Sequence, residues 1–556
     1  MDADNFSQLT ITDVQFLPIV KEYARRINLV ETIDHLVDTE MDLQPGIVVL
    51  GMVLDTLSGR SPLYRLKDFL EEKDTELLLG EAIPAEQFTD YNIGRALDKI
   101  YETGTQKIFG QLSQNAVGGF QIKPTSAHYD TTSISVFGDY VMTDEPFEIT
   151  YGHSKDKRPD LKQFLIEMLC VDRNIPLFGK TRDGNASDKT LNNELLSSIS
   201  KHMANHGLAE NAFVYVADSA FVTPDNLEKA GTTIKFISRL PATYNECRRA
   251  IQTAVTTNRW IDIGVVAETQ DTEKRPAAYY KAFDTTVVLH DISYRAIVIH
   301  SSAHDKRRHK RIDRLLKKNK DDLKKLANQM TAETYYCEAD ARAAAEKVSN
   351  LTKKSDCFVI HTAVNEVAKY RRGRPKKGEK RTPERMEYQL DVTLIEDESK
   401  VKILREEAGC FVLLSNLNAP EERDAWCAED LLRLYKNQSG IEQNFGFLKD
   451  PVIVNSVFLK KNSRIEVLGM VLLISLLIWR LIERSMRRYI EQEQTTITGW
   501  AKRRIKRPTS FMMTTKFHTV LVIKKGKRRQ LARPLKPVQL EYLKALNVTP
   551  EAFVLP

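Results

Sequence analysis

The longest apolar run in the chain, "VLGMVLLISLLIW" at residues 467–479, sets the strongest limit on how this sequence folds. It is bounded by two charged residues, Glu466 and Arg480. A transmembrane helix needs about 20 predominantly apolar residues, so this run is too short to cross a bilayer. It therefore predicts a helix buried in a protein core, against which the other elements must pack.

Composition places the chain among ordinary folded proteins. At 556 residues it is too long for one core, and we expect about two to four domains. Its 42% apolar and 28% charged residues exclude a disordered chain. Six cysteines without a C-x-x-C pair argue against a zinc site or a disulfide framework, so we expect a reducing cytoplasm. The polar, acidic start "MDADNFSQLT" differs from a secretory signal, and we expect no membrane association.

Positive charge is unevenly distributed. The formal net charge is +7, yet residues 301–330 alone contain eleven Lys and Arg against four Asp. A second basic block covers residues 502–536. Clustering of this kind favours a polyanionic partner, most simply nucleic acid. The alternative is that these charges only solvate exposed helix faces.

The hydrophobic pattern divides the chain into regions. Residues 1–118 predict helices at 12–29, starting at Thr12 or Asp13, at 45–59, and at 89–112, capped near Asp90. From 119 onward, alternating stretches at 127–138, 212–220 and 233–241 predict strands, with a short helix at 223–231, which together suggest an α/β layer.

The second half is less regular. Residues 245–408 contain further strand candidates, charged helices over roughly 303–350 and a basic loop at 369–385. A strand at 410–416 precedes a helix that carries "YKNQSGIEQNFGFLK" at 435–449. Its interior glycine predicts an interruption or bend near Ser439 and Gly440, because glycine weakens a helix by ~1 kcal/mol relative to alanine.

Three acidic residues occupy unusual positions. Asp130 lies within a strand, and Asp218 directly follows the apolar strand "FVYVA". Glu442 is spaced seven residues from Tyr435 and from Lys449, which places all three on or close to the packing stripe of a helix. A single Asp after a strand is usually a turn former or a cap. Three such carboxylates, however, form the oxygen ligand set that two-metal phosphoryl chemistry requires.

The segment 435–449 resembles the Y-(2)-R-(3)-E-(6)-K signature of DDE transposases of bacterial insertion sequences, in insertion sequence family four. Tyr435, Glu442 and Lys449 match its spacing, whereas Gln438 stands where the signature has Arg. "HYDTTSISVFG" and "YVADSAF" resemble the first and second acidic motifs of that group. "YGHSKDKRPDLKQ", "DGNASDKT" and "FISRLP" are similar to a subgroup that carries a helical N-terminal domain.

The resemblance implies an α/β fold: an RNase H-like catalytic domain with a mixed five-stranded sheet, split by a mainly β insertion with helices, plus an α-helical N-terminal domain. The expected divisions are 1–118 for the helical domain that binds DNA ends, 119–244 for the first part of the catalytic domain, 245–408 for the β-rich insertion with basic helices, 409–490 for the second catalytic part with the Glu helix, and 491–556 for a basic C-terminal region that contacts DNA or a second subunit.

The resemblance also implies an activity. Asp130, Asp218 and Glu442 would be the catalytic residues and the ligands of two Mg²⁺ ions, with Mn²⁺ able to replace them. Tyr435 and Lys449, together with position Gln438, would contact the DNA backbone at the transposon end. The expected enzyme binds terminal inverted repeats, cleaves the DNA and transfers the strand to target duplex DNA. It would act as a homodimer on DNA in the bacterial cytoplasm, at the nucleoid. An inactive DNA-binding relic and a stand-alone RNase H-like nuclease are the alternatives.

Other features have two interpretations each. "RRGRPKKG" at 371–378 resembles an AT-hook core, in which Arg372 and Arg374 enter a narrow minor groove, or it is an exposed basic loop. Trp260 could stack on an unpaired base or pack in a core. His153 and Lys155, between the first two acids, could approach the scissile phosphate or serve structure alone.

Overall fold

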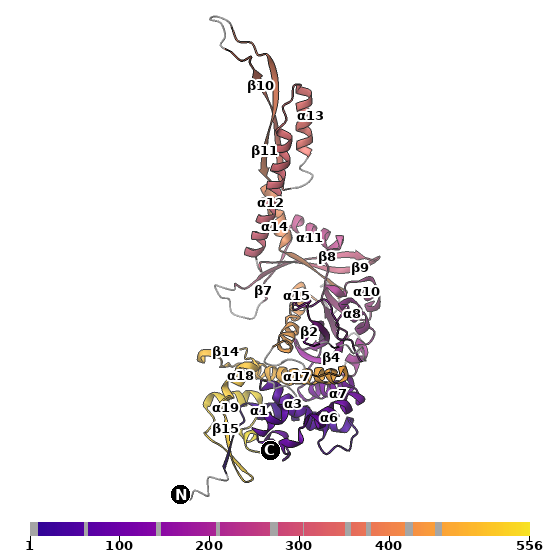
Figure 1. Ribbon diagram of the computed structural model, residues 1–556, viewed down its shortest axis with the longest axis vertical. Helices are drawn as coiled ribbons and strands as arrows, with labels where there is room; N and C mark the ends of the chain where they lie inside the picture. The colour runs from indigo at the N-terminus through magenta and orange to yellow at the C-terminus, as the bar shows by residue number, and fades with distance from the viewer. Residues whose placement is uncertain are drawn as a thin grey trace. The chain divides into compact units, whose positions relative to one another are not determined.

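The structure is a computed structural model of the chain (Figure 1), and it describes residues 9–59, 65–138, 140, 146–206, 212–266, 276–303, 305–350, 357–373, 380–417, 426–450 and 459–556. The chain divides into two compact units. The first consists of Met1–Arg239, Ser415–Leu417 and Asp430–Pro556, and the second of Leu240–Leu414 and Asn418–Glu429.

Five strands of the first unit lie side by side in the order β4-β3-β2-β5-β6. Their bounds are β2 Ser126–Val136, β3 Lys162–Val171, β4 Ile175–Arg182, β5 Val214–Ala217 and β6 Lys235–Arg239. β2 pairs antiparallel with β3, and β3 with β4, whereas β2 and β5, and β5 and β6, run parallel. The strands expected at 127–138, 212–220 and 233–241 are therefore present, whereas the β3–β4 hairpin had not been predicted. β3 is buried along almost its whole length, as expected for a strand covered on both faces.

The expected core helix is α17 (Asn462–Gln492), which at 31 residues is much longer than its apolar run. By length and composition it could cross a membrane, but its most apolar window is 94% buried inside the structure, as in a core helix. α17 packs against β4 and against several of the N-terminal helices (Figure 1), of which α7 also contacts β4 directly. Those helices are α1 Leu17–Arg26, α2 Leu29–Leu36, α3 Pro45–Leu57, α4 Leu66–Glu71, α5 Thr75–Leu79, α6 Asp90–Thr103 and α7 Thr105–Gly119.

Two expectations for the N-terminal helices were wrong. Residues Leu9–Asp13 form strand β1, so α1 begins only at Leu17. β1 pairs antiparallel with β15 (Leu521–Lys525) of the C-terminal hairpin, a partner that no local pattern reveals. The helix expected over 89–112 is also two helices, because Gly104 adopts a φ of 99° between α6 and α7. The cap of α6 is Thr89, whose hydroxyl accepts a hydrogen bond from the amide of Asn92.

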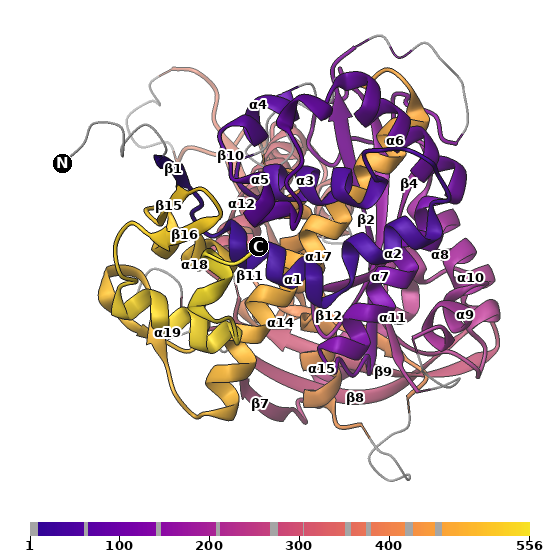
Figure 2. The ribbon, with the colours of Figure 1, turned by 90° about the horizontal axis from the view of Figure 1, so that it is seen from below.

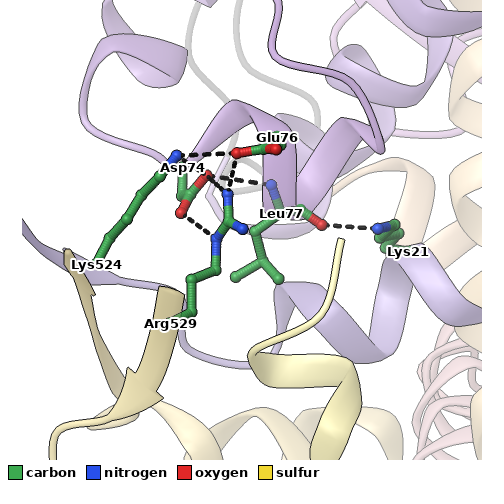
Figure 3. Close-up of polar contacts among 6 residues, drawn as sticks. All are labelled: Lys21, Asp74, Glu76, Leu77, Lys524 and Arg529. Carbon is green, nitrogen blue, oxygen red and sulfur yellow. Dashed lines mark hydrogen bonds and ion pairs between the residues drawn. The ribbon is translucent and has the colours of Figure 1, made fainter. Parts of the chain in front are cut away.

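An ion cluster ties the C-terminal hairpin to helix α5 (Figure 3). Arg529 on β16 (Arg528–Leu531) donates to the Asp74 carboxylate at 2.6 and 2.9 Å and to Glu76 at 2.6 Å. Lys524 on β15 lies 3.3 Å from Asp74 and 3.2 Å from Glu76. Asp74 also caps α5 by accepting from the amide of Leu77 at 3.1 Å. Burial raises the pKa of Asp74, but the hydrogen bonds from Arg529 and Leu77 hold it below its usual value.

The remaining elements of the first unit surround this framework (Figure 2). They are η3 Ala85–Gln87, α8 Asp188–Leu196, α9 Ile199–Ala204, η4 Ser219–Phe221, α10 Pro224–Ala230, α15 Ala428–Lys436, α16 Ser439–Leu448, β13 Ile497–Thr498, η6 Trp500–Lys502, β14 Arg504–Ile505, α18 Ser510–Phe517, α19 Pro537–Leu546 and η7 Pro550–Phe553. The short helix expected at 223–231 is α10, which begins at Pro224 and stops before Gly231.

The second unit contains strands in the order β12-β9-β8-β7 and a separate long hairpin, β10–β11. The bounds are α11 Asn245–Thr257, β7 Ile261–Val265, β8 Tyr279–Leu289, β9 Ile292–Ser301, α12 Asp305–Thr331, α13 Glu338–Ser349, β10 Phe358–Lys369, β11 Arg385–Glu396, α14 Glu398–Ala408 and β12 Cys410–Ser415. Helices α12 and α13 lie along the hairpin (Figure 1) and share a small apolar core with it. The strands and charged helices expected in this stretch are thus present.

Candidate active site

The register of β2 against β5 brings two of the predicted acids together. Ser126 lies opposite Val214, and His128 lies opposite Val216, in parallel pairing. The pairing ends at His128 and Val216, so Asp130 on β2 and Asp218 after β5 each lie two residues beyond the last pair. The two carboxyl groups are close enough that Asp218 raises the pKa of Asp130. Both residues are half-buried.

A third acid that sequence reasoning missed joins this pair. Asp188 begins helix α8, which packs against η4, the short helix that Asp218 caps. The hydroxyl of Thr131 donates a hydrogen bond to the Asp188 carboxylate. Asp188 lies within the "DGNASDKT" stretch, but an acid in the first turn of a helix is ordinarily explained by the helix dipole alone.

Lys155 places a positive charge between two of these acids. Its Nζ lies 3.6 Å from an oxygen of Asp130 and 3.4 Å from one of Asp188. The same amine donates to the carbonyl of Thr131 at 2.7 Å and to its hydroxyl at 2.8 Å. Lys155 is therefore beside the first acid, whereas the side chain of His153 is exposed.

The electrostatics of the site follow from burial and from like charge. Burial raises the pKa of Asp130 to about 6; Lys155 and the Thr131 amide oppose this, and Asp218 and Asp188 add to it. Burial likewise raises the pKa of Asp218. The amide of Ala220, which donates to the carboxylate at 3.0 Å, lowers this pKa, and the charge of Asp188 raises it further. Ionised carboxylates crowded in this way favour a cation between them.

Glu442 lies on a separate helix, α16. The helix is interrupted between α15, which ends at Lys436, and α16, which begins at Ser439, close to the predicted interruption. A Cβ on Gly440 would lie 2.3 Å from the carbonyl oxygen of Arg173, so a glycine is needed for this close approach. α16 packs against β2, the strand of Asp130, and against α17.

The orientation inferred for Glu442 was wrong. Its side chain is exposed, while Ile441, Asn444 and Phe445 fill the buried face of α16. The break also places Tyr435 on α15, so the two residues do not share one continuous helical stripe. A spacing of seven residues predicts a shared face only if the helix between them is unbroken.

Tyr435 nevertheless links the three predicted acids. The residue is half-buried, and burial raises the pKa of its hydroxyl. Arg239, at the end of β6, opposes this shift, while Asp218, Glu442 and Asp130 each raise the pKa further. Asp218, Glu442 and Asp130 therefore each lie close enough to Tyr435 to affect the pKa of its hydroxyl. Arg239 belongs to the "FISRLP" stretch, but it had not been singled out as a site residue.

The other residues of the signature have protein partners or neighbours. Nζ of Lys449 donates to a carboxylate oxygen of Asp156 at 2.5 Å. Gln438 is the half-buried residue that precedes α16. The structure thus places Lys449 beside the segment that also carries Lys155.

Within the described ranges, no group of three or more His, Cys, Asp and Glu side chains is arranged to hold a metal ion. The donors that do converge are carboxylate oxygens, which are the ligands that Mg²⁺ prefers. Asp130, Asp218 and Asp188 are therefore brought together, with Glu442 on the adjoining helix, but they do not form a closed ligand cage. These oxygen donors are of the type that a hard divalent cation takes, but among the described residues they are not gathered into a ligand set.

Two predicted DNA contacts lie in the second unit. Arg372 is exposed beyond the end of β10, whereas Arg374 lies outside the described residues. The ring of Trp260 meets Phe283 edge-on at 6.4 Å and His300 at 6.1 Å between centroids. Trp260 is half-buried, so packing explains much of its environment, and a stacking role stays a prediction.

Comparison with known proteins gives limited information. Residues 9–114 match a family described as a domain of unknown function (DUF4277). No curated protein matched the chain. One solved structure, described as "Cryo-EM structure of piggyBac transposase synaptic complex with hairpin DNA", aligns with 83% of this chain and 74% of that chain, with a TM-score of 0.36 and 8% identity. A TM-score this low does not establish a shared fold, so membership of the insertion-sequence group stays a prediction.

Proposed function

We propose that this chain is a DDE transposase that binds the terminal inverted repeats of an insertion sequence, cleaves the DNA and joins the freed strand to target DNA. The observation that carries the proposal is that Asp130 and Asp218 each lie two residues beyond the last parallel pair of β2 and β5, with the Glu442 helix packed on β2. Acids at the ends of neighbouring strands are typical of α/β ligand sites.

The strand arrangement supports an RNase H-like catalytic domain. The order β4-β3-β2-β5-β6, with two antiparallel and two parallel pairings, agrees with the mixed five-stranded sheet that the sequence resemblance implies. The second unit leaves this framework after Arg239 and rejoins it at Ser415, near the bounds expected for an insertion at 245–408.

Asp130, Asp218 and Glu442 would hold two Mg²⁺ ions, for which Mn²⁺ could substitute, and Asp188 is available as a fourth carboxylate. When bound, such ions activate the attacking oxygen and stabilise the leaving oxygen. Lys155 contributes a fixed positive charge that offsets the repulsion between Asp130 and Asp188.

DNA contacts at the site would come from residues on both sides of Glu442. Lys449 would exchange its ion pair with Asp156 for a phosphate, and the Tyr435 hydroxyl would donate to another phosphate. Gln438 can offer a neutral amide only. Transposition joins two DNA ends, so we infer a homodimer on DNA in the bacterial cytoplasm.

The test is an incubation of the full chain with a labelled duplex that carries one end of the encoding element, with Mg²⁺ present. Wild-type protein should cleave at the element end and yield joined products. Glu442→Gln should reduce cleavage at least about 100-fold, because a ligand is lost. The matched control is Glu228→Gln, an exposed acid on α10, which should cleave like the wild type.

Each other result rejects part of the proposal. If the wild type binds the duplex but never cleaves it, the chain is a DNA-binding relic. Cleavage without joined products would identify a nuclease. Normal cleavage by Glu442→Gln would remove Glu442 from the site.

A further inference from the structure

Helix α12 of the second unit carries an unusual concentration of charge. Its 27 residues, Asp305–Thr331, contain eleven Lys and Arg and four Asp, a net charge of 11 − 4 = +7. The neighbouring α13, Glu338–Ser349, contains two basic and three acidic residues, a net charge of 2 − 3 = −1. Both helices lie along the same hairpin (Figure 1), so a general need for solubility does not explain why only one of them is strongly basic.

The two faces of α12 have different roles. Ile312, Leu316, Leu323 and Ala327 are buried and form one stripe, of which the first three belong to the apolar core shared with α13 and the hairpin. At about 100° per residue, the exposed basic side chains centre roughly 180° from that stripe. We call these seven residues the basic stripe: Arg307, Lys310, Arg311, Arg314, Lys317, Lys318 and Lys325. Asp321 is the acid that interrupts it.

The basic stripe is not neutralised by the protein. Across the part of the chain that the structure describes, none of its seven side chains forms an ion pair or a hydrogen bond. The helix is instead fixed by residues beside the stripe: Arg308 donates to the carbonyl of Ala408, and Asp313 pairs with Arg405 of α14 at 2.8 Å. A rigidly held cationic surface is therefore presented to solvent.

The dimensions of the stripe suit a duplex. From Arg307 to Lys325 it extends about 27 Å at 1.5 Å per residue. Double-stranded DNA carries about 16 phosphates over that length. Contacts of Lys and Arg with phosphate fix a protein on the duplex but carry no sequence information directly.

The end of α12 adjoins a second basic region. After the helix ends, Tyr335 pairs with Tyr388 of β11, three residues from Arg385. The exposed residues around the end of the hairpin include Lys369, Arg372 and Arg381. Lys369 and Arg385 pair with Glu387 at 3.5 and 2.8 Å, so part of this positive charge is offset within the second unit.

We propose that the basic stripe of α12 binds the phosphate backbone of duplex DNA without sequence specificity. The inference rests on the proposed function only in naming DNA as the polyanion. Its role would be to retain DNA on the second unit.

The test measures binding of the full chain to a 30-base-pair duplex of arbitrary sequence, with EDTA present so that no cleavage occurs. The stripe variant combines R307Q, R311Q, R314Q and K318Q. The matched control removes the same charge at scattered exposed lysines, with K107Q, K123Q, K201Q and K402Q. Circular dichroism and the unfolding transition establish that both variants are folded.

The stripe variant should bind at least about 10-fold more weakly at 0.1 M salt, and the slope of log affinity against log salt should fall by about 3 to 4. The control should stay within about twofold of the wild type. Equal losses in both variants, or an unchanged salt slope in the stripe variant, would overturn the proposal. So would displacement of the DNA by polyglutamate of equal charge, which would indicate an acidic protein partner.

Failure here and failure of the proposed function give different results. If the wild type does not cleave DNA but the stripe variant binds DNA more weakly as predicted, only the catalytic proposal is rejected. If the wild type cleaves DNA but the stripe variant binds DNA as tightly as the wild type, only the proposal for the basic stripe is rejected.

Discussion

At the scale of single residues, Asp130 is held in a costly environment. Its carboxyl group is half-buried and is close enough to Asp218 and Asp188 that both raise its pKa. A folded-state pKa of about 6 lies above the usual 3.8, so the folded protein binds more protons than the unfolded chain between these pH values. The contribution of this group to stability is therefore greatest at low pH and is lost as the pH rises through about 6.

Asp130→Asn should stabilise the protein at pH 7. The amide cannot ionise, so the free energy of unfolding should rise by about 1–2 kcal/mol, and the difference should disappear below about pH 4. Urea unfolding across this pH range measures it. Glu228→Gln, at an exposed site, should change stability by less than about 0.5 kcal/mol. An Asp130→Asn protein that is less stable than the wild type at pH 7 would contradict this view of the site.

At the scale of elements, helix α16 positions Glu442 through a glycine contact. Gly440 lies against the backbone of Arg173, where an added Cβ would approach a carbonyl oxygen at 2.3 Å. Gly446, on the same helix, has no neighbour within 4 Å of an added Cβ. The two glycines therefore allow the same substitution to be compared in one helix.

Gly440→Ala should destabilise the protein by about 1–3 kcal/mol, because the helix or the Arg173 loop must move. It should also lower cleavage, since α16 carries Glu442. Gly446→Ala should be neutral or stabilising by up to about 1 kcal/mol through its helix propensity. Thermal unfolding of both variants measures the difference, and equal effects would show that the Gly440 contact does not position the helix.

The sequence predicted most elements whose signal is local. The strands of Asp130 and Asp218, the Pro-initiated helices α3 and α10, and the buried α17 follow from hydrophobic period and from turn residues. Strand β1 was missed because its partner β15 lies some 500 residues away. The exposure of Glu442 was missed because the seven-residue spacing was applied across the break between α15 and α16. Asp188 was missed because only the fold brings α8 against η4, just after β5.

At the scale of the whole chain, the cluster in Figure 3 joins segments that are 455 residues apart. The side chains of Asp74 and Arg529 are each only 2% exposed. A buried charge that loses its partner is strongly destabilising, whereas Lys524 is partly exposed and shares the same carboxylates.

Arg529→Met should therefore destabilise the protein by about 3 kcal/mol at pH 7, and Lys524→Met by less than about 1 kcal/mol. The pKa of Asp74 is lower in the folded protein than the value near 3.8 expected in the unfolded chain. The ionised carboxylate therefore stabilises the fold fully above about pH 3.8, and this stabilisation is lost as the pH falls through the folded-state pKa. The loss in free energy of unfolding caused by Arg529→Met should accordingly be smaller at pH 3 than at pH 7. Denaturant unfolding at pH 7 and pH 3 measures it, and similar costs for both variants would argue against a buried ion pair.

We propose that Asp130, Asp218 and Glu442 hold divalent metal ions at one centre. The most direct measurement is a titration with Mn²⁺ of the full chain bound to an element-end duplex, with free Mn²⁺ followed by electron paramagnetic resonance and the DNA alone subtracted. The account predicts about two tightly bound ions per chain for the wild type and for Glu228→Gln. It predicts fewer for Asp130→Asn, Asp218→Asn and Glu442→Gln. Equal Mn²⁺ binding by all five proteins, or none by the wild type, would contradict it.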